Sequence, residues 1–311
     1  MDSSQMAEHF LRVSRIEKNL SPRTLRAYRS DLNGFWMHIG NQLIENVDVS
    51  LIRDYLEDLE TRGLNGSSIK RKLATLKVFF LFLEDEKLIH HSPVRKFKRK
   101  FRTARRLPRV MSIEEIQKIL IAANNEATRH TQSSKLTRLR TLRDRAMLEL
   151  LFCTGIRIDE LVKLDISDLN LPAQSLVVFG KGRKERRLFL SSQEVITALQ
   201  TYLEQRLQWG ADSQALFLNR LRVRIGTSAV RAVFQRFTHM TGLPSRFTPH
   251  CLRHSMATML IENGADVRSV QEILGHSRIS TTEIYLTVSQ QRRRDVLTRY
   301  NGRNSISVNG Q

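Results

Sequence analysis

Residues 247–286 read FTPHCLRHSMATMLIENGADVRSVQEILGHSRISTTEIYL. Thr248 and Pro249 predict the start of a helix, because a threonine hydroxyl can cap free backbone amides and proline fits the first helical turn. Apolar residues then recur at helical spacing up to Gly264, and a second apolar stripe ends at Gly275. The stretch therefore predicts two consecutive helices, each ended by a glycine.

Basic and imidazole side chains accompany these two helices. His250, Arg253 and His254 fall on neighbouring turns of the first helix, so they lie near one face. His276 follows the glycine that ends the second helix, and Tyr285 comes nine residues later. A helix N-terminus attracts anions, and a guanidinium beside it strengthens that attraction. The pattern predicts a site for a phosphate or another oxyanion.

Three segments together resemble the motifs of one enzyme family. HCLRH at 250–254, LGH at 274–276 and Tyr285 are similar to the carboxy-terminal motif of the tyrosine recombinases of phage-integrase and Xer type. TGIRIDEL at 154–161 resembles the family's first arginine box, and GKG at 180–182 resembles its catalytic-lysine hairpin. Ordered motifs over so long a stretch are specific, whereas one alone is weak.

The chemistry of a tyrosine nucleophile shows why such groups are needed. A tyrosine hydroxyl has an ordinary pKa near ~10. It attacks a phosphodiester only if charge on the phosphoryl oxygens is stabilised and the leaving oxygen is protonated. With Tyr285 as nucleophile, Arg157 and Arg253 would bind the non-bridging oxygens. The resemblance implies a 3′-phosphotyrosyl link, a free 5′-hydroxyl, and no need for ATP, a metal or another cofactor.

The remaining residues of the predicted site handle protons or orient other groups. Lys181 is the predicted general acid for the departing 5′ oxygen, and His250 and His276 would donate a hydrogen bond to the phosphate or accept the tyrosine proton. Glu160 would orient the basic cluster, and His254 would support it. Two alternatives are disfavoured: a zinc site, because the histidine and cysteine spacing matches no usual ligand set, and Tyr300 as nucleophile, because it has no LGH motif before it.

Charge is the most informative feature of the composition. The 311 residues include 51 Lys and Arg against 31 Asp and Glu, a net charge of +20. This excess favours a polyanion such as nucleic acid as partner. A membrane surface is the rival, but no apolar run approaches the ~20 residues needed to span a bilayer. The two cysteines, Cys153 and Cys251, suggest a reducing compartment, and we expect the chain in the cytoplasm.

Residues 1–91 predict a four-helix bundle. The first helix is expected at about residues 3–17, and the second begins at Pro22. The third contains Tyr55 and ends near Gly63, and the fourth begins after Asn65. Together these helices resemble the family's core-binding domain. The fourth helix carries a basic patch that we interpret as binding DNA, namely Lys70, Arg71, Lys72 and Lys77. A merely solvated face is the alternative.

The segment 92–111 predicts an extended basic linker that follows the DNA backbone. It contains two prolines and no acidic residue. Its positive residues are Arg95, Lys96, Lys98, Arg99, Lys100, Arg102, Arg105, Arg106 and Arg109. A solubilising tether, the alternative interpretation, would not need so many positive charges.

Residues 112–288 predict a mostly helical α+β catalytic domain with a small antiparallel β-hairpin, so the fold class is mainly α. The expected elements are helices at 112–123, 139–153, 191–209 and 227–240, an exposed loop at 124–138, a hairpin at 176–190 and a strand at 215–218. Residues 289–311 would form a short helix and a polar tail. By resemblance, that segment docks on a neighbouring protomer.

The resemblance implies a site-specific DNA recombinase that acts as a tetramer through a Holliday junction. Its partners would be double-stranded DNA with a recombination site and other protomers of itself or of a related recombinase. Integration, excision and dimer resolution all remain open. A type IB topoisomerase-like enzyme and a catalytically silent DNA-binding protein are the alternatives.

Overall fold

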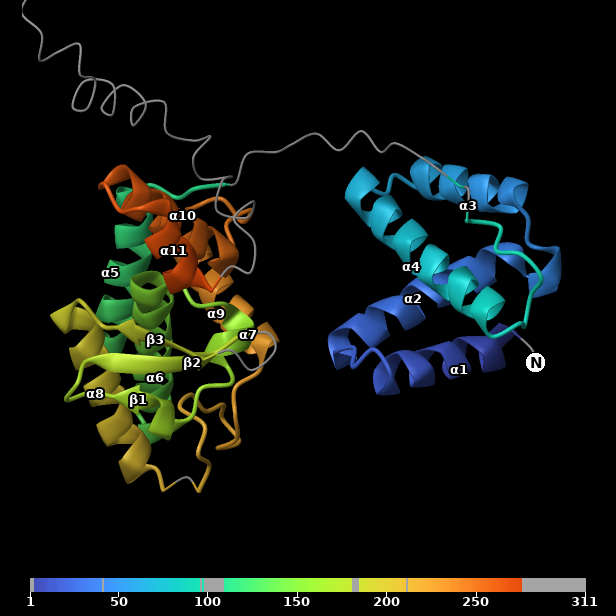
Figure 1. Ribbon diagram of the computed structural model, residues 1–311. Helices are drawn as coiled ribbons and strands as arrows, with labels where there is room; N and C mark the ends of the chain where they lie inside the picture. Colours follow the sequence, from blue (N-terminus) through green and yellow to red (C-terminus); the bar gives the residue numbers. More distant parts are fainter. Residues whose placement is uncertain are drawn as a thin grey trace, which may run out of the picture. The chain divides into compact units, whose positions relative to one another are not determined.

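The computed structural model describes residues 3–40, 42–95, 97, 109–180, 185–210 and 212–275. The chain divides into two compact units, Met1–Arg105 and Arg106–Gln311, which we call the N-terminal and C-terminal units (Figure 1). Both are mainly helical, and the C-terminal unit adds a small antiparallel sheet. The predicted fold class is confirmed. No helix in the described part of the chain is long and apolar enough to cross a membrane.

Four α-helices build the N-terminal unit as far as its residues are described. They are α1 (Ser3–Ile16), α2 (Pro22–Ile39), α3 (Val49–Thr61) and α4 (Gly66–Asp85), with a 3-10 turn, η1, at Ile44–Asn46. Ser21, Asp48 and Asn65 cap α2, α3 and α4, each accepting a hydrogen bond from the amide three residues on, at 3.2, 2.9 and 2.9 Å. Because these caps are local, the helix starts could be predicted from sequence.

Aromatic rings fill the core of this bundle. Phe10, Phe35, Phe79 and Phe80 are fully buried. Phe10 meets Phe79 edge-on with ring centroids 5.4 Å apart, and Phe35 meets Phe80 edge-on at 6.0 Å. Such pairs stabilise beyond their buried area, so α1, α2 and α4 are held as one body.

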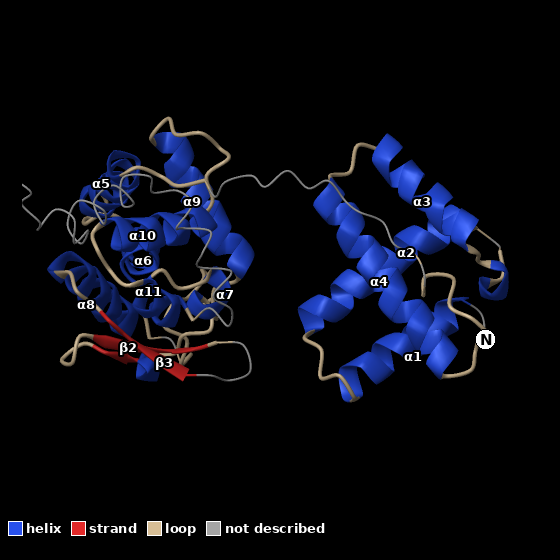
Figure 2. Ribbon diagram, turned by 45° about the horizontal axis from the view of Figure 1, so that its top comes forward, coloured by secondary structure: helices blue, strands red, loops and turns tan. Residues whose placement is uncertain are grey.

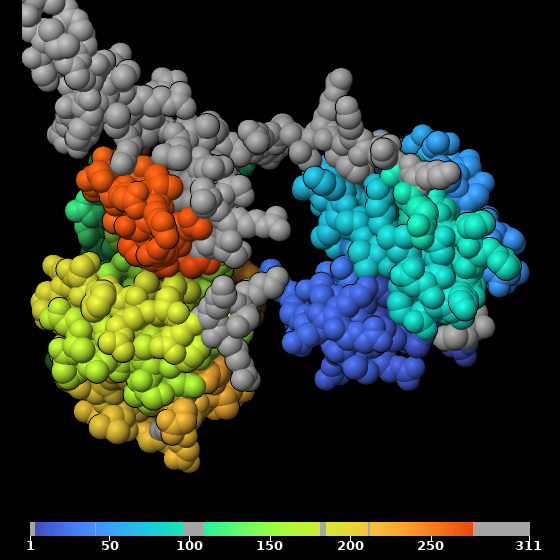
Figure 3. Space-filling model, in the orientation of Figure 1, coloured from blue at the N-terminus to red at the C-terminus, as the bar shows by residue number. Residues whose placement is uncertain are grey.

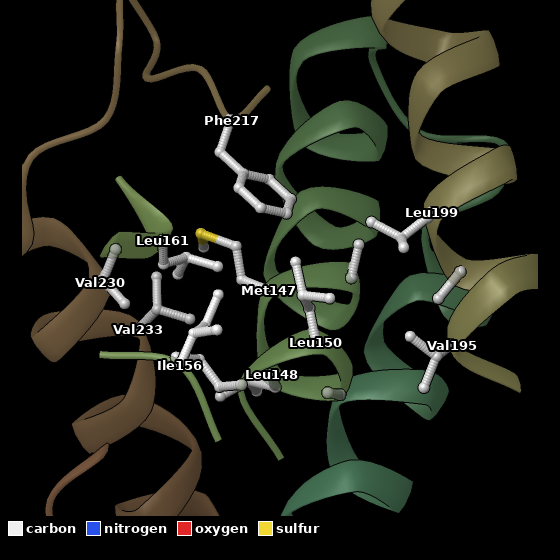
Figure 4. Close-up of a cluster of buried hydrophobic side chains, with 14 of the residues drawn as sticks. Met147, Leu148, Leu150, Ile156, Leu161, Val195, Leu199, Phe217, Val230 and Val233 are labelled. Atoms are coloured by element: carbon white, nitrogen blue, oxygen red, sulfur yellow. The ribbon is translucent and has the colours of Figure 1, made fainter. Parts of the chain in front are cut away.

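The C-terminal unit is organised around one long helix, α6 (Lys135–Thr154). The other elements are α5 (Ile113–Arg129), α7 (Ile158–Leu161), η2 (Ile166–Asp168), β1 (Leu169–Asn170), β2 (Ser175–Phe179), β3 (Glu185–Phe189), α8 (Gln193–Gln208), α9 (Thr227–Met240), α10 (Pro249–Glu262) and α11 (Val267–Leu274). Helices α5, α8 and α10 pack against α6. Figure 4 shows Met147 and Leu150 of α6 in the core between α8 and α9.

The strands form one antiparallel sheet in the order β1-β2-β3, at one side of the helices of this unit (Figure 2). Leu176 pairs with Leu188 and Val178 with Arg186. The first three of these side chains are buried, so the inward face of the hairpin is apolar except for Arg186.

The predicted loop at 124–138 is too long, because only residues 130–134 lie between the two helices. Helix α5 continues to Arg129, and α6 begins at Lys135, capped by Ser134. Tertiary contacts explain the extension, because Glu126 is buried and accepts a hydrogen bond from Arg236 of α9 at 2.7 Å. The segment is polar in sequence, yet its one buried carboxylate pairs with an arginine of another helix.

The predicted strand at 215–218 is also only partly present. Ala215 and Leu218 take part in two isolated bridges, to Asp165 and Arg224. The segment is fully buried, which explains its strand-like composition without a continuous ladder.

Candidate active site

The turn after α6 brings Arg157 to the site. Gly155 ends α6 in the left-handed conformation, at φ 60°, and Arg157 begins α7. A Cβ atom on Gly155 would lie 3.0 Å from Leu274 Cδ2 and 3.2 Å from Met256 Sδ. Only glycine combines this φ with such close packing. The Arg157 side chain remains 38% exposed, so it can reach a bound anion.

Glu160 of α7 accepts hydrogen bonds at both carboxylate oxygens. Oε1 accepts from Arg157 Nη1 at 3.0 Å and from Arg186 Nη1 at 3.1 Å. Oε2 accepts from the Arg157 amide at 2.9 Å and from Arg186 Nη2 at 2.8 Å. The Glu160 side chain is only 7% exposed. Glu160 therefore contacts two guanidinium groups, and its orienting role stays a prediction.

The charge state of Glu160 follows from those partners. Burial raises the pKa of its carboxyl group, but the hydrogen bonds from Arg186 and the Arg157 amide, with the charges of both arginines, outweigh burial and hold the pKa below its ordinary value. Glu160 is therefore an anion that fixes two guanidinium groups.

Arg253 of α10 is buried beside the same turn. It is 2% exposed. Its Nη1 donates to the Gly155 carbonyl at 2.5 Å and its Nη2 to the Leu274 carbonyl at 2.6 Å. A guanidinium has five N–H donors, so these bonds orient the group without exhausting it. Arg253 thus joins the ends of α6 and α11, which the sequence did not predict.

The two described histidines of the site form a pair on α10. The His250 and His254 ring centroids lie 4.4 Å apart, with the rings at 75°. Desolvation, followed by the charges of Arg253 and Arg157, lowers the pKa of His250 below its ordinary value. Desolvation, followed by the charges of His250 and Arg253, lowers the pKa of His254 to about 4. Both imidazoles are therefore neutral near pH 7.

Three predicted catalytic residues, Lys181, His276 and Tyr285, lie outside the described residues. The described chain on either side of Lys181 is the predicted hairpin, with β2 ending at Phe179 and β3 beginning at Glu185. Within the described part of the chain, no three histidine, cysteine, aspartate or glutamate side chains gather in a group that could hold a metal ion.

The basic patch of α4 is partly engaged in contacts within its own unit. The buried Asp31 carboxylate accepts a hydrogen bond from Arg71 at 2.5 Å and lies 3.4 Å from Lys72 Nζ. Lys77 Nζ donates to the Phe97 carbonyl at 2.7 Å. Lys70 is exposed. The four residues therefore differ in how available they are to DNA.

The described start of the predicted linker is not extended. Val94 and Phe97 are buried in the core of the N-terminal unit, and Arg95 Nη2 donates to Glu84 at 2.8 Å. Apolar side chains within the basic run explain the difference, since each gains by burial. Lys96 and the positively charged residues from 98 to 106 lie outside the described residues.

Arg186 is the site residue that sequence reasoning missed. It occupies an inward-facing position of β3, next to Leu188 and Leu190 in the alternating pattern. A charged residue at such a position is a usable signal, because unpaired charges are rarely buried.

Comparison with known proteins agrees with these motifs over most of the chain. Residues 109–292 match the Phage integrase family and residues 7–87 the Phage integrase N-terminal SAM-like domain. Tyrosine recombinase XerD of Staphylococcus epidermidis is 35% identical over 302 residues, covering 95% of this chain and 98% of the relative. Tyrosine recombinase XerC of Leptospira interrogans is 33% identical over 297 residues, covering 94% of this chain and 92% of the relative.

Solved structures share the fold. XerH recombinase bound to a palindromic difH substrate, in a post-cleavage complex, has a TM-score of 0.74 at 24% identity and covers 96% of this chain and 85% of its own. A lambda integrase tetramer bound to a Holliday junction has a TM-score of 0.68 at 19% identity, and the match covers 92% of this chain and 77% of the integrase chain. The two family matches and the 35% identity to XerD show that the chain belongs to the phage integrase family of tyrosine recombinases.

Proposed function

We propose that this recombinase cuts and rejoins DNA at a specific site through a 3′-phosphotyrosyl link on Tyr285, without a metal ion or ATP. The observation that carries the proposal is the cluster of Arg157, Glu160, His250 and Arg253 around the junction of α6, α10 and α11. Its cations and neutral imidazoles suit a phosphodiester whose charge grows in the transition state.

The proposed cleavage step is an in-line substitution at phosphorus. The Tyr285 oxygen forms a bond to phosphorus while the bond to the 5′ oxygen breaks, and the electron pair leaves with that oxygen. Lys181 gives the departing oxygen its proton, and His250 or His276 takes the tyrosine proton. Arg157 and Arg253 donate to the non-bridging oxygens. Rejoining reverses these transfers with a different 5′-hydroxyl, so no external energy source enters.

The protonation state of His250 supports its part in this step. An imidazole accepts a proton only when it is neutral, and the lowered pKa of His250 keeps it neutral at physiological pH. Proton acceptance by His250 would be lost only as the pH falls below this lowered pKa.

We further propose that the enzyme works as a tetramer through a Holliday junction in the cytoplasm. Its partners would be double-stranded DNA with a recombination site and further protomers of itself or a related recombinase. The solved relatives include a recombinase bound to difH DNA and an integrase tetramer bound to a Holliday junction. Residues 289–311, which lie outside the described residues, would dock on a neighbouring protomer.

Covalent trapping tests the proposal. The wild type and Tyr285→Phe are incubated in EDTA with nicked suicide duplexes made from host DNA fragments that the protein retains at moderate salt. Denaturing gels and peptide mapping then locate any adduct. We expect an adduct on Tyr285 in the wild type and none in the variant, which should still bind DNA.

The other outcomes separate the alternatives. Tight binding without an adduct would identify a silent DNA-binding protein. An adduct formed by a monomer that relaxes supercoils, with no Holliday junction detected, would indicate a topoisomerase-like enzyme. Normal cleavage by Tyr285→Phe would exclude Tyr285 as nucleophile.

A further inference from the structure

Arg186 is a charged residue on the buried face of a strand. It lies in β3 opposite Val178, which is buried, and two positions before Leu188, also buried. Its own side chain is 13% exposed. A guanidinium at such a position is retained only where its charge and donors are matched.

All three nitrogens of the Arg186 guanidinium donate hydrogen bonds. Nη1 and Nη2 bind the two Glu160 oxygens at 3.1 and 2.8 Å, and Nε binds the Ile273 carbonyl at 2.9 Å. The last carbonyls of a helix have no partner within it and favour cations. Arg186 therefore ties β3 to α7 and to the C-terminal end of α11. In Figure 3 the orange surface of α10 and α11 adjoins the yellow-green surface of the strands.

The packing around this guanidinium leaves it little freedom. A Cβ atom on Gly275 would lie 3.0 Å from Arg186 Nη1 and 3.3 Å from Arg186 Cδ. Gly275 itself has φ 65°. The backbone after α11 therefore lies directly against the Arg186 side chain, which fixes its direction toward Glu160.

Arg186 reaches Arg157 through a shared carboxylate. Glu160 Oε1 accepts from Nη1 of both arginines, at 3.0 Å from Arg157 and 3.1 Å from Arg186. Without Arg186, each oxygen of the Glu160 carboxylate would keep only its Arg157 donor, so the second guanidinium that fixes the carboxylate plane would be lost. A bidentate guanidinium fixes a carboxylate in plane as a lysine ammonium cannot.

We propose that Arg186 is a positioning residue for strand cleavage, which holds Glu160 and through it the Arg157 guanidinium in the geometry that receives the scissile phosphate. This inference rests on the proposed function. Arg186 does not touch DNA in this role; it acts through Arg157.

Single-turnover cleavage of a suicide duplex, with DNA affinity and thermal unfolding measured in parallel, tests the role. The variants are Arg186→Gln and Arg186→Lys. Arg187→Gln is the matched control, since Arg187 is the next residue on the same strand and is exposed on the opposite face. Arg186→Lys keeps a cation beside buried Glu160, so it should fold even if Arg186→Gln does not.

We expect both Arg186 variants to cleave about 100-fold more slowly than the wild type, the scale of a misplaced catalytic group. DNA affinity should change by less than about threefold, because the interaction lost is made only in the transition state. Arg187→Gln should cleave like the wild type. Arg186→Gln combined with Glu160→Gln should be no slower than the slower single variant, because the two residues act as one unit.

Two modified substrates identify the group through which Arg186 acts. A methylphosphonate replaces one charged non-bridging oxygen with a neutral methyl group, so it lessens the need for Arg157. A 5′-bridging phosphorothiolate has a better leaving group and lessens the need for Lys181. The loss of cleavage rate in Arg186→Gln, relative to the wild type, should be smaller on the methylphosphonate, and so should that in Arg157→Gln. On the phosphorothiolate the loss in Arg186→Gln should persist.

The inference is overturned if the folded Arg186 variants cleave like the wild type, or if their deficit shrinks on the phosphorothiolate and not on the methylphosphonate. It is equally overturned if the deficit is unchanged on both substrates, because a general loss of structure would give that result. No adduct with wild-type protein would overturn the proposed function itself, and with it this inference. An adduct with wild-type protein and unimpaired Arg186 variants would overturn only the inference.

Discussion

At the residue scale, the site depends on one buried anion among several cations. Glu160 binds the Arg157 and Arg186 guanidinium groups and the Arg157 amide. A protein with a net charge of +20 gathers these arginines at a short distance only because a carboxylate lies between them. Glu160 therefore sets both the stability and the geometry of the site.

Glu160→Gln should lower the free energy of unfolding by about 3 kcal/mol, the cost of leaving buried charges without their partner. Cleavage should fall more than DNA affinity, because Arg157 would lose its orientation. Denaturant unfolding and suicide-duplex cleavage measure the two effects. Asp159→Asn, at the exposed neighbouring residue, is the control. Equal losses in both variants would mean that removal of any nearby charge is responsible.

The pKa of His254 predicts how stability depends on pH. Its folded-state pKa of about 4 lies below the ordinary value of 6.5, so the unfolded chain binds protons more strongly. The stabilisation is fully present above about pH 6.5 and is lost as the pH falls toward 4. Measured by thermal unfolding, the wild type should lose more stability over this pH window than His254→Asn loses. His239→Asn, at an exposed histidine of α9, should follow the wild type; if it instead follows His254→Asn, the assignment is wrong.

At the element scale, the C-terminal ends of α6 and α11 meet the side of α10 at Gly155. Arg253 of α10 donates to the Gly155 and Leu274 carbonyls, and Leu274 and Met256 pack on the Gly155 backbone. Two helix ends and the side of a third helix are thus packed closely together. The position of Arg157 follows from this packing.

Gly155→Ala should lower the free energy of unfolding by about 1–2 kcal/mol because of the left-handed backbone alone. The close contacts with Leu274 and Met256 should lower it further. Gly210→Ala is the matched control, because Gly210 has φ 65° and no neighbouring atom within 4 Å of a Cβ. Denaturant unfolding should show a larger loss for Gly155→Ala than for Gly210→Ala. Equal losses would show that the packing at Gly155 adds nothing to the backbone strain.

At the scale of the whole molecule, some positive charges neutralise buried carboxylates and others remain exposed on the surface. Arg71 and Lys72 neutralise the buried Asp31, and Arg236 binds the buried Glu126. Lys70 is exposed on the same helix as Arg71. Part of the net positive charge is therefore paired with carboxylates inside the fold.

Lys70→Gln and Lys77→Gln compare an exposed charge with one that is bonded within the fold. Lys70→Gln should weaken DNA binding and reduce the slope of log K against log salt by about 1, with unchanged thermal stability. Lys77→Gln should change the salt slope less and lower the melting temperature, because Lys77 binds the Phe97 carbonyl. Fluorescence anisotropy over a salt series measures both slopes. A larger slope change for Lys77→Gln would contradict this assignment.

The fold class, most helix starts, the hairpin and the family motifs could all be predicted from the sequence. These features are local: Ser21, Asp48 and Asn65 cap their own helices, and the motif residues can be recognised from their spacing. The predicted roles of Lys181, His276 and Tyr285 stay predictions, since those residues lie outside the described chain.

Tertiary structure alone decided which polar groups serve the fold and which serve the site. Glu126 turned an expected loop into helix by pairing with Arg236 from another helix. Arg186 became part of the site because Glu160 and the Ile273 carbonyl lie beside it. The physical reason is common to both: the energy of a buried charge depends on its partner, and partners distant in the sequence meet only when the chain has folded.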